Sequence, residues 1–246
     1  MNPLPKTNTR IFLWSGPRNI STTLMYSFAQ RKDTKVFDEP LYAHYLSKTE
    51  AKEYHPDAEL IMSSQECNGQ TVVRNMLTEN GSEVLFYKNM THHLIDLNLD
   101  FLAQGFNLIL TRNPREMLAS FRQVIENPNL SDTGYLDHLK LVKHLKENSI
   151  PFLIMDAKEI LLDPETSMKA LCKHSQIPFD PSMLYWKAGK RKEDGVWAKH
   201  WYKSIHESTG FKSYIPKNEP FPEKLITLLK QCETKYQQLL SMRSNQ

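Results

Sequence analysis

Residues 16–23, Gly-Pro-Arg-Asn-Ile-Ser-Thr-Thr, are of the types that bind a phosphate. They follow the apolar run 11–14 and lead into an amphipathic run that begins at Ser21. A strand, a short loop and a helix N-terminus in this order present backbone N–H groups and the positive end of a helix dipole to an anion. We therefore expect this loop to hold a phosphate, with Arg18 as its cation.

The loop differs from the phosphate loop of ATPases and kinases, whose pattern is G-x-x-x-x-G-K-[ST]. Ser21 and Thr22 occupy the positions of the second glycine and the lysine of that pattern. In those enzymes the lysine reaches the β- and γ-phosphates, and an acidic strand end helps to hold Mg²⁺. Here one predicted strand ends in Thr111 and is followed by Arg112. ATP with magnesium therefore fits this chain poorly.

A second strand-to-helix corner carries Arg112 and, eight residues later, Ser120. Asn113 and Pro114 suit the N-cap and the first position of a helix. Because the Cα–Cβ bond of a helical residue leans toward the helix N-terminus, the side chain of Ser120 points back toward Arg112. The two side chains can share one phosphate. The alternative is an arginine that bonds a neighbouring carboxylate, beside an incidental serine.

Both corners resemble motifs of the sulfotransferase family. Residues 17–23 are similar to the loop that binds the phosphosulfate end of 3′-phosphoadenosine 5′-phosphosulfate (PAPS), except that cytosolic members carry lysine where Arg18 stands. The spacing of Arg112 and Ser120 is similar to the family motif for the 3′-phosphate. The resemblance implies that the phosphosulfate is bound by Arg18, Asn19, Ser21, Thr22 and Thr23.

Two later segments extend this resemblance over roughly residues 10–211. Residues 152–165 resemble the late strand of the family and the acidic turn after it. Residues 190–197 resemble the basic segment, with glycine and tryptophan, that folds over the 3′-phosphate. The resemblance implies that Arg191, Lys192 and Gly195 bind the nucleotide. The alternative for this basic run is a solvated surface.

The resemblance implies an enzyme that transfers a sulfuryl group from PAPS to a hydroxyl of a small-molecule acceptor. Transfer of a neutral SO₃ unit between two oxygens requires alignment of donor and acceptor, a base, and charge stabilisation at the leaving oxygen. Arg18 is the candidate for that stabilisation, because a guanidinium stays ionised, and Lys88 is a second candidate. Two rival functions stay open, a nucleotide or metabolite kinase and a nucleotide-binding protein without turnover.

Two positions are candidates for the general base. Glu39 follows a predicted strand and would face the phosphate loop, although it could instead pair with Arg18 or cap a helix. His92 and His93 follow another predicted strand in a segment, 88–93, that is loosely similar to a Lys-Thr-His segment of the family. Adjacent helical positions point about 100° apart, so we expect at most one of the two rings to face the site. Neither histidine has zinc-site spacing, and we expect no metal.

The elements that must position these residues are five predicted strands, alternating with helical patterns. This alternation indicates an α/β protein with a three-layer P-loop-like fold, in which a mostly parallel five-stranded sheet is flanked by helices. Ligands then bind at the carboxyl ends of the strands. At 246 residues we interpret 1–246 as a single domain. The predicted strands are residues 10–15, 35–38, 83–88, 107–111 and 151–156.

Three less regular stretches lie between and after these strands. Residues 47–81 lack a clear period, residues 127–134 indicate an exposed loop, and residues 187–215 mix charged and aromatic residues, as in a loop that closes over a ligand. In the last stretch Trp197 and Trp201 either form a buried helix face or line the site, where a cationic acceptor could contact them. After Pro222 the apolar spacing predicts an amphipathic helix.

Composition narrows the class of protein. A net charge of +3 is mild for a nucleic-acid binder, so we expect no nucleic-acid partner. Three cysteines without C-x-x-C spacing indicate neither disulfides nor zinc. No run reaches membrane-spanning length and the first ten residues lack a signal-like apolar core. We therefore expect a cytoplasmic protein with no membrane partner; the sequence carries no signal for an oligomeric state.

Overall fold

The computed structural model describes residues 8–123, 125–216 and 220–243. Its centre is a five-stranded sheet with the order β2-β3-β1-β4-β5, and every neighbouring pair is parallel. The prediction of a mostly parallel sheet is confirmed, and each strand lies within two residues of its predicted bounds. The strands are β1 (Thr9–Ser15), β2 (Thr34–Asp38), β3 (Val84–Met90), β4 (Phe106–Thr111) and β5 (Phe152–Asp156).

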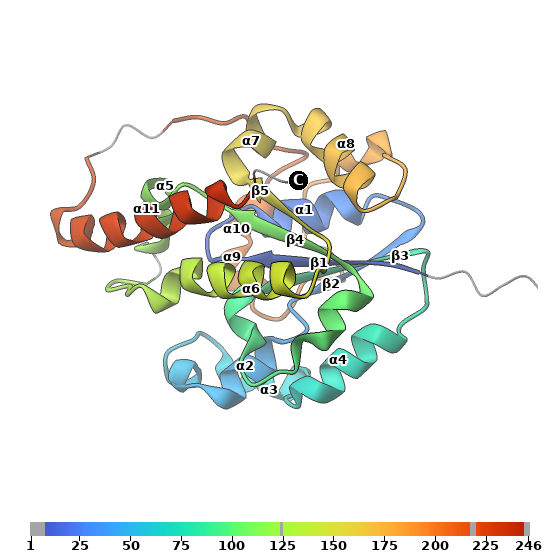
Figure 1. The fold of residues 1–246 in the computed structure, drawn as a ribbon, viewed down its shortest axis with the longest axis horizontal. Coiled ribbons are helices and arrows are strands. Elements are labelled where there is room, and N and C mark those ends of the chain that lie inside the picture. The colour runs from blue at the N-terminus through green and yellow to red at the C-terminus, as the bar shows by residue number, and fades with distance from the viewer. Residues whose placement is uncertain (1–7, 124, 217–219, 244–246) are drawn as a thin grey trace, which may run out of the picture.

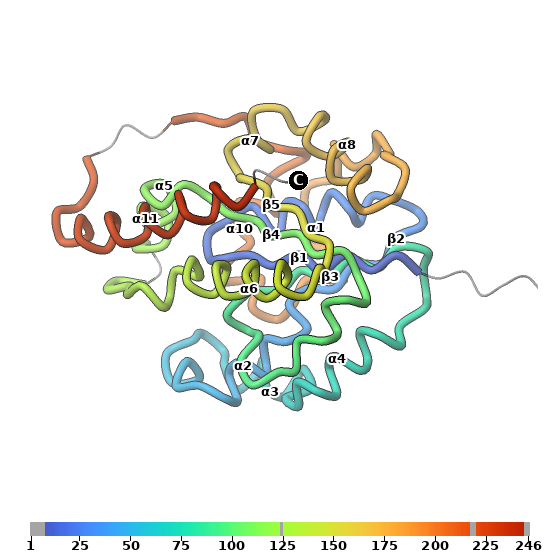
Figure 2. The backbone as a smooth tube through the Cα atoms, in the orientation of Figure 1, coloured from blue at the N-terminus to red at the C-terminus, as the bar shows by residue number. Residues whose placement is uncertain are grey.

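Helices cover both faces of this sheet, which gives three layers (Figure 1). The long helices are α1 (Ser21–Phe28), α4 (Gly69–Thr78), α5 (Pro114–Phe121), α6 (Tyr135–Glu147), α8 (Pro164–His174) and α11 (Ile226–Ser241). Shorter ones are α2 (Tyr42–Lys48), α3 (Ala58–Ser64), α7 (Ala157–Leu162), α9 (Ala198–Trp201) and α10 (Lys203–His206). The predicted C-terminal helix is thus present as α11, which packs against α5 and α6 (Figure 2).

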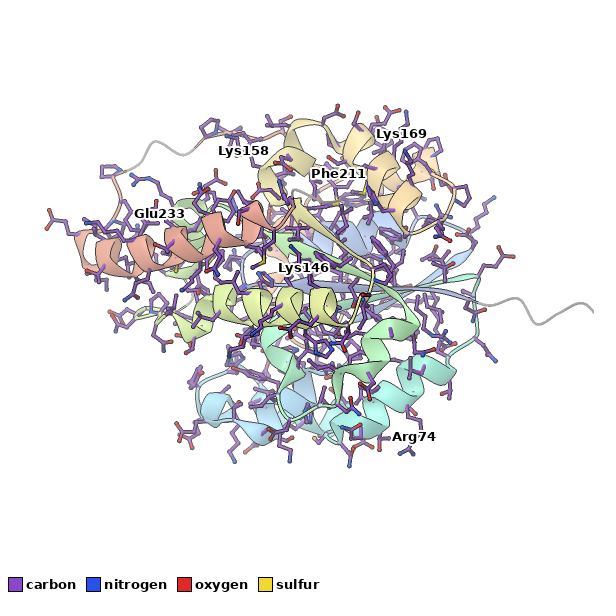
Figure 3. All side chains as sticks on the ribbon, in the orientation of Figure 1. Arg74, Lys146, Lys158, Lys169, Phe211 and Glu233 are labelled. Atoms are coloured by element: carbon purple, nitrogen blue, oxygen red, sulfur yellow. The ribbon has the colours of Figure 1, made fainter. Side chains whose placement is uncertain are left out.

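Alternating strand residues divide the core between the two faces, because successive side chains of a strand point to opposite sides. In β1, Ile11 and Leu13 pack with α1, α7 and α8. Phe12 and Trp14 pack on the other face with α4 and α6. Charged side chains such as those of Arg74, Lys169 and Glu233 lie on the outside of the helices (Figure 3).

The order of the strands decides where a ligand can bind. The chain leaves β1 at the middle of the sheet, goes to the β2 edge, returns through β3, and crosses to β4 and β5. The carboxyl ends of β1, β3 and β4 therefore lie side by side at the point where the strand order reverses. In open parallel sheets ligands bind at this place. In the described ranges we find no helix that is both long and apolar enough to span a bilayer.

Candidate active site

The loop after β1 opens directly onto the N-terminus of α1. Residue Ile20 occupies the N-cap position, and no side chain caps the helix. The first N–H groups of α1 are therefore free to bind an anion. Asn19 fastens the loop to the neighbouring strand, because its side-chain amide donates to the carbonyl oxygen of Leu110 at 2.9 Å. Glycine at position 16 allows a close approach, since a Cβ there would lie 3.0 Å from the carbonyl oxygen of Thr133.

The two predicted phosphate-binding corners meet in space. The Arg18 Nε donates to the Ser120 hydroxyl at 3.0 Å, and an Arg112 Nη donates to the carbonyl oxygen of Arg18 at 2.9 Å. Arg112 also forms an ion pair of 3.2 Å with Glu116, so the alternative role considered for this arginine is present as well. The structure thus brings Arg18, Arg112 and Ser120 together, although 102 residues separate Arg18 from Ser120.

Two like charges meet at this junction. Burial lowers the pKa of Arg18, and the positive charge of Arg112 lowers it further. Arg18 also adopts a left-handed backbone conformation, with φ of 54°, which a non-glycine residue rarely takes without support from its surroundings. The junction is therefore a place where an added anion would relieve repulsion between two arginines.

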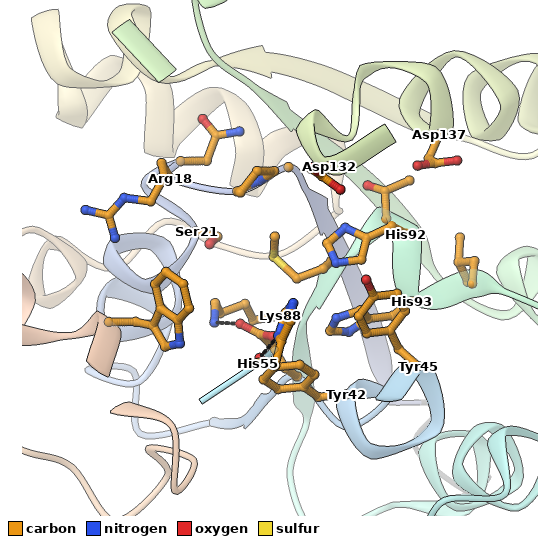
Figure 4. A pocket seen from close by; sticks show the side chains of 18 of the residues that line it. Arg18, Ser21, Tyr42, Tyr45, His55, Lys88, His92, His93, Asp132 and Asp137 are labelled. Atoms are coloured by element: carbon orange, nitrogen blue, oxygen red, sulfur yellow. Dashed lines mark hydrogen bonds and ion pairs between the residues drawn. The ribbon is translucent and has the colours of Figure 1, made fainter. Parts of the chain in front are cut away.

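Beside this loop lies a cavity of about 620 Å³. It is bordered by the phosphate loop, by the ends of β2 and β3, by α2 and by the segment around α9 (Figure 4). The sequence-predicted residues Arg18, Asn19, Ser21, Thr22, Glu39, Lys88, His92 and His93 all line it. Arg112, Ser120 and Thr23 are not on its wall; the first two lie at the junction behind the loop.

At the bottom of the cavity a buried cluster joins two carboxylates to one lysine. The Lys88 Nζ donates to Asp38 at 2.8 Å, to Glu39 at 2.5 Å and to the Tyr202 hydroxyl at 2.6 Å. An ammonium group has three N–H donors, so these three partners use all of them. Asp38 also accepts from the backbone N–H of Gly195 at 3.0 Å. The cluster thus ties the end of β2 to the segment that closes the cavity.

The charges of this cluster set its protonation. Burial raises the pKa of Glu39, Lys88 opposes that shift, and the neighbouring Asp38 adds to it. Burial alone would lower the pKa of Lys88, but Asp38 and Glu39 raise it well above its usual value. Both pKa shifts are consistent with a Lys88 that stays charged beside the two carboxyl groups. Glu39 is then the group that takes up a proton most readily.

Both histidines line the cavity, which contradicts the expectation that at most one would face it. They lie in a short 3₁₀ turn, Thr91–Leu94, rather than in an α-helix, and their rings contact edge to face with centroids 4.7 Å apart. Burial lowers the pKa of His92 to about 3, and burial with the neighbouring His92 lowers the pKa of His93 well below its usual value. Both imidazoles are therefore neutral at pH 7.

With this geometry in view, comparison with known proteins identifies the family. The family model described as a sulfotransferase domain matches residues 9–239. The chain belongs to the sulfotransferase family. The resemblance seen in residues 17–23 and at Arg112 and Ser120 is confirmed at the level of the family.

The chain is similar to proteins of different length. It is 43% identical over 235 residues to branched-chain-amino-acid aminotransferase-like protein 1 of Arabidopsis thaliana, with 94% of this chain and 41% of that protein covered. The chain therefore spans less than half the length of the curated relatives that it matches.

A sulfotransferase of Alicyclobacillus acidocaldarius has a TM-score of 0.55 at 9% identity, with 96% of each chain covered. The sulfotransferase domain of the curacin biosynthetic pathway has a TM-score of 0.50 at 12% identity, with 94% of this chain and 98% of that chain covered. These two structures share the fold, which confirms the predicted three-layer P-loop-like architecture.

The basic segment of this sulfotransferase lies apart from the arginine junction. Arg191 donates to the carbonyl oxygen of Ala29, near the C-terminus of α1, and forms an ion pair with Glu193. Lys192 is exposed. Among the described residues no hydrogen bond or ion pair joins Arg191 or Lys192 to Arg112 or Ser120. Their binding of a 3′-phosphate stays a prediction.

What closes the cavity is aromatic rather than basic. Trp197, Trp201 and Tyr202 line the cavity. Trp197 is also buried, with 2% of its surface exposed. This residue therefore both packs in the interior and lines the site. A Cβ at Gly195 would lie 2.2 Å from the Trp197 ring. Gly195 therefore has a local reason to be glycine, in addition to its hydrogen bond to Asp38.

Several residues that line the cavity were not predicted from the sequence. Tyr42 and Tyr45 are three apart in α2, a spacing that places them on one helix face, but the sequence did not show that this face borders the site. Tyr54 and His55 lie in an irregular segment, and Asp132 lies in the short 3₁₀ helix Ser131–Thr133; neither place carries a sequence motif. In the described part of the chain, no group of three or more His, Cys, Asp or Glu side chains is arranged to hold a metal ion.

Proposed function

We propose that this sulfotransferase transfers a sulfuryl group from PAPS to a hydroxyl of a small-molecule acceptor, in line and with the help of a general base. The observation that carries the proposal is the meeting of Arg18, Arg112 and Ser120 at the reversal point of the sheet. A ligand with phosphates at two places can contact both corners at once. ATP has no phosphate on its ribose for the second corner.

The residues of the first loop suit the phosphosulfate end. The uncapped N-terminus of α1 offers backbone N–H donors, and Ser21 and Thr22 border the cavity at the same place. The side-chain oxygen of Asn19 is buried and has no hydrogen-bond partner among the described residues. Arg18 supplies a permanent charge beside the transferring group. PAPS, when bound, would supply an activated sulfuryl group and a good leaving group.

Glu39 is the better candidate for the base. A general base works best when its pKa lies near the operating pH. Burial moves the pKa of Glu39 upward, toward that range, whereas burial lowers the pKa of His92 to about 3 and that of His93 well below its usual value. The two imidazoles are thus weak bases here, and we assign them to shaping the acceptor pocket.

Lys88 then acts through Glu39 rather than on the donor. All three of its N–H groups are engaged by Asp38, Glu39 and Tyr202, so it has none left for a leaving oxygen. We infer that it holds the Glu39 carboxylate at the cavity wall. Charge stabilisation at the leaving oxygen then falls to Arg18.

Thermal stabilisation by 3′,5′-bisphosphoadenosine, compared with ATP and magnesium, tests the nucleotide. Ligand at 100 times its dissociation constant adds about 2.7 kcal/mol to the free energy of unfolding. We expect the bisphosphate to raise the melting temperature and ATP with magnesium to have little effect. Stabilisation by ATP alone would favour a kinase. Binding of the bisphosphate without its release from PAPS, across alcohols, phenols and amino alcohols, would favour a binding protein without turnover.

A further inference from the structure

The wall of the cavity away from Arg18 is built from aromatic rings. Tyr45 lies with its ring centroid 4.8 Å from His92 and 4.9 Å from His93. Tyr42 stacks on His93 at 5.0 Å and meets the edge of Trp197 at 5.1 Å. These rings come from α2, from the turn after β3 and from the closing segment, and all of them border the cavity. The wall thus presents ring faces and edges, beside aliphatic side chains such as Leu94 and Ile95.

The imidazole rings of this wall are uncharged, and Lys140, which also lines the cavity, is paired with Asp137 at 3.3 Å. Burial holds the pKa of His55, His92 and His93 below the usual value, so the imidazoles are neutral. The Nδ1 atoms of His92 and His93 are buried, and neither has a hydrogen-bond partner among the described residues. His93 is 1% exposed. A ligand that enters the cavity thus meets uncharged aromatic and imidazole rings.

Asp132 adds an uncompensated negative charge to the same cavity. Figure 4 shows Asp132 between Arg18 and Asp137, with His92 and His93 below. Asp137 is 3.3 Å from the ammonium group of Lys140, but Asp132 has no ion-pair partner in the described ranges and accepts only from the backbone N–H of Asn129, at 2.8 Å. Its charge reaches the aromatic wall, since it opposes the lowering of the His55 pKa that burial causes.

The donor end and the acceptor end of the cavity therefore differ in charge. At the donor end lies Arg18, which belongs to the loop 16–23. At the other end lie the rings, with Asp132 between them and Arg18 in Figure 4, and the buried Lys88 is already matched by two carboxylates. A cation over aromatic faces is attracted by the ring quadrupole, most strongly where water is excluded. A carboxylate beside the rings adds to this attraction.

We propose that the acceptor is an amino alcohol or an amino phenol, whose ammonium group is held by the aromatic wall and Asp132 while its hydroxyl faces Glu39. This inference rests on the proposed function, which supplies the hydroxyl and the base. The hydroxyl oxygen forms the new bond to sulfur, the bond from sulfur to the bridging oxygen of PAPS breaks, and the hydroxyl proton passes to the Glu39 carboxylate. The ammonium group takes no part in the transfer and serves as the recognition element.

Two pairs of probes that differ in one positive charge test the inference. One pair is choline and 3,3-dimethylbutan-1-ol, and the other is tyramine and 4-ethylphenol. Binding to the protein saturated with 3′,5′-bisphosphoadenosine is followed by tryptophan fluorescence, because Trp197 and Trp201 line the cavity. We expect the cation of at least one pair to bind about tenfold more tightly than its neutral partner, as for a hydrogen bond or contact to a charged group.

The Asp132→Asn variant should remove most of this preference. Its amide oxygen can still accept from the N–H of Asn129, so the loop keeps that hydrogen bond. The matched control is Asp100→Asn, which removes the same charge from an exposed residue outside the cavity wall and should keep the preference. Equal or tighter binding of the neutral partners, the absence of binding by all four probes, or an unchanged preference in Asp132→Asn would overturn the inference.

The binding measurement separates this inference from the proposed function, because it needs no turnover. A preference for the cations without any sulfated product would support the cation site and refute the sulfotransferase activity. Sulfate transfer to the neutral alcohols alone would support the activity and refute the cation site.

Discussion

The two neighbouring carboxylates at the end of β2 should separate activity from stability. Asp38 accepts hydrogen bonds from Lys88, Tyr202 and Gly195 at 2.8 to 3.0 Å, whereas the side chain of Glu39 has one hydrogen bond within the described residues, to Lys88. Glutamine at position 39 can keep that bond. We expect Glu39→Gln to lower kcat by about 10²- to 10⁴-fold, the usual contribution of a general base, and to leave the fold intact.

The same variant should be at least as stable as the wild type at neutral pH. Burial raises the pKa of Glu39 above its usual value, so the folded protein holds this proton more tightly than the unfolded chain does. The stabilisation that this proton gives is full below about pH 4.5 and is lost as the pH rises through the folded-state pKa. Glutamine cannot ionise. The melting temperature of Glu39→Gln, relative to that of the wild type, should therefore increase as the pH rises above 4.5.

Asp38→Asn should show the opposite behaviour. Breaking a buried ion pair costs about 3–5 kcal/mol, and we expect about 3 kcal/mol, the lower end of this range, because Glu39 remains as a partner for Lys88. For a protein of this size that corresponds to a melting temperature lower by roughly 6–12 °C.

Thermal unfolding between pH 4 and 9 and steady-state kinetics, with wild type and both variants side by side, measure these effects. The kcat of the wild type should rise with pH through the Glu39 pKa, since the base must be ionised. If Glu39→Gln keeps its activity within about threefold, far less than the loss of a general base costs, Glu39 is not the base. A loss of stability in Glu39→Gln as large as in Asp38→Asn would refute the division of roles between the two carboxylates.

Three other variants test separate parts of the site. Arg112→Ala should weaken binding of 3′,5′-bisphosphoadenosine by about 10- to 100-fold in calorimetry, with little change in the melting temperature. The control, Arg115→Ala at an exposed neighbouring position, should change the affinity little. Equal affinities of the two variants for the bisphosphate would contradict the assignment of Arg112 to phosphate binding. Gly195→Ala should destabilise the fold by about 1–3 kcal/mol in denaturant unfolding, because the Cβ would meet the Trp197 ring, and an unchanged midpoint would show that the closing segment shifts freely. His92→Asn should leave the shape of the kcat profile between pH 5 and 9 unchanged, since burial lowers the pKa of His92 to about 3; a shifted limb in that range would return this histidine to the candidates for the base.

The local elements of this protein are encoded within short stretches of its sequence. Five apolar runs predicted the five strands, and the spacing after Pro222 predicted α11. The loop 16–23 and the pair Arg112 and Ser120 were predicted as two corners that cooperate. Each of these predictions depends on residue types and on a period of two or 3.6 residues. About ten consecutive residues are therefore enough to make it.

The composition of the site was decided by contacts between distant segments. Asp38 and Tyr202 are 164 residues apart and share a hydrogen bond, and Asp132 reaches the cavity from the short 3₁₀ helix Ser131–Thr133. Glu39 and Arg18 take left-handed backbone conformations, with φ of 44° and 54°, although neither residue type favours them. No local sequence pattern predicts such pairings, because burial and charge compensation stabilise them. Both arise only when the sheet has formed and the segment around α9 has packed over the cavity.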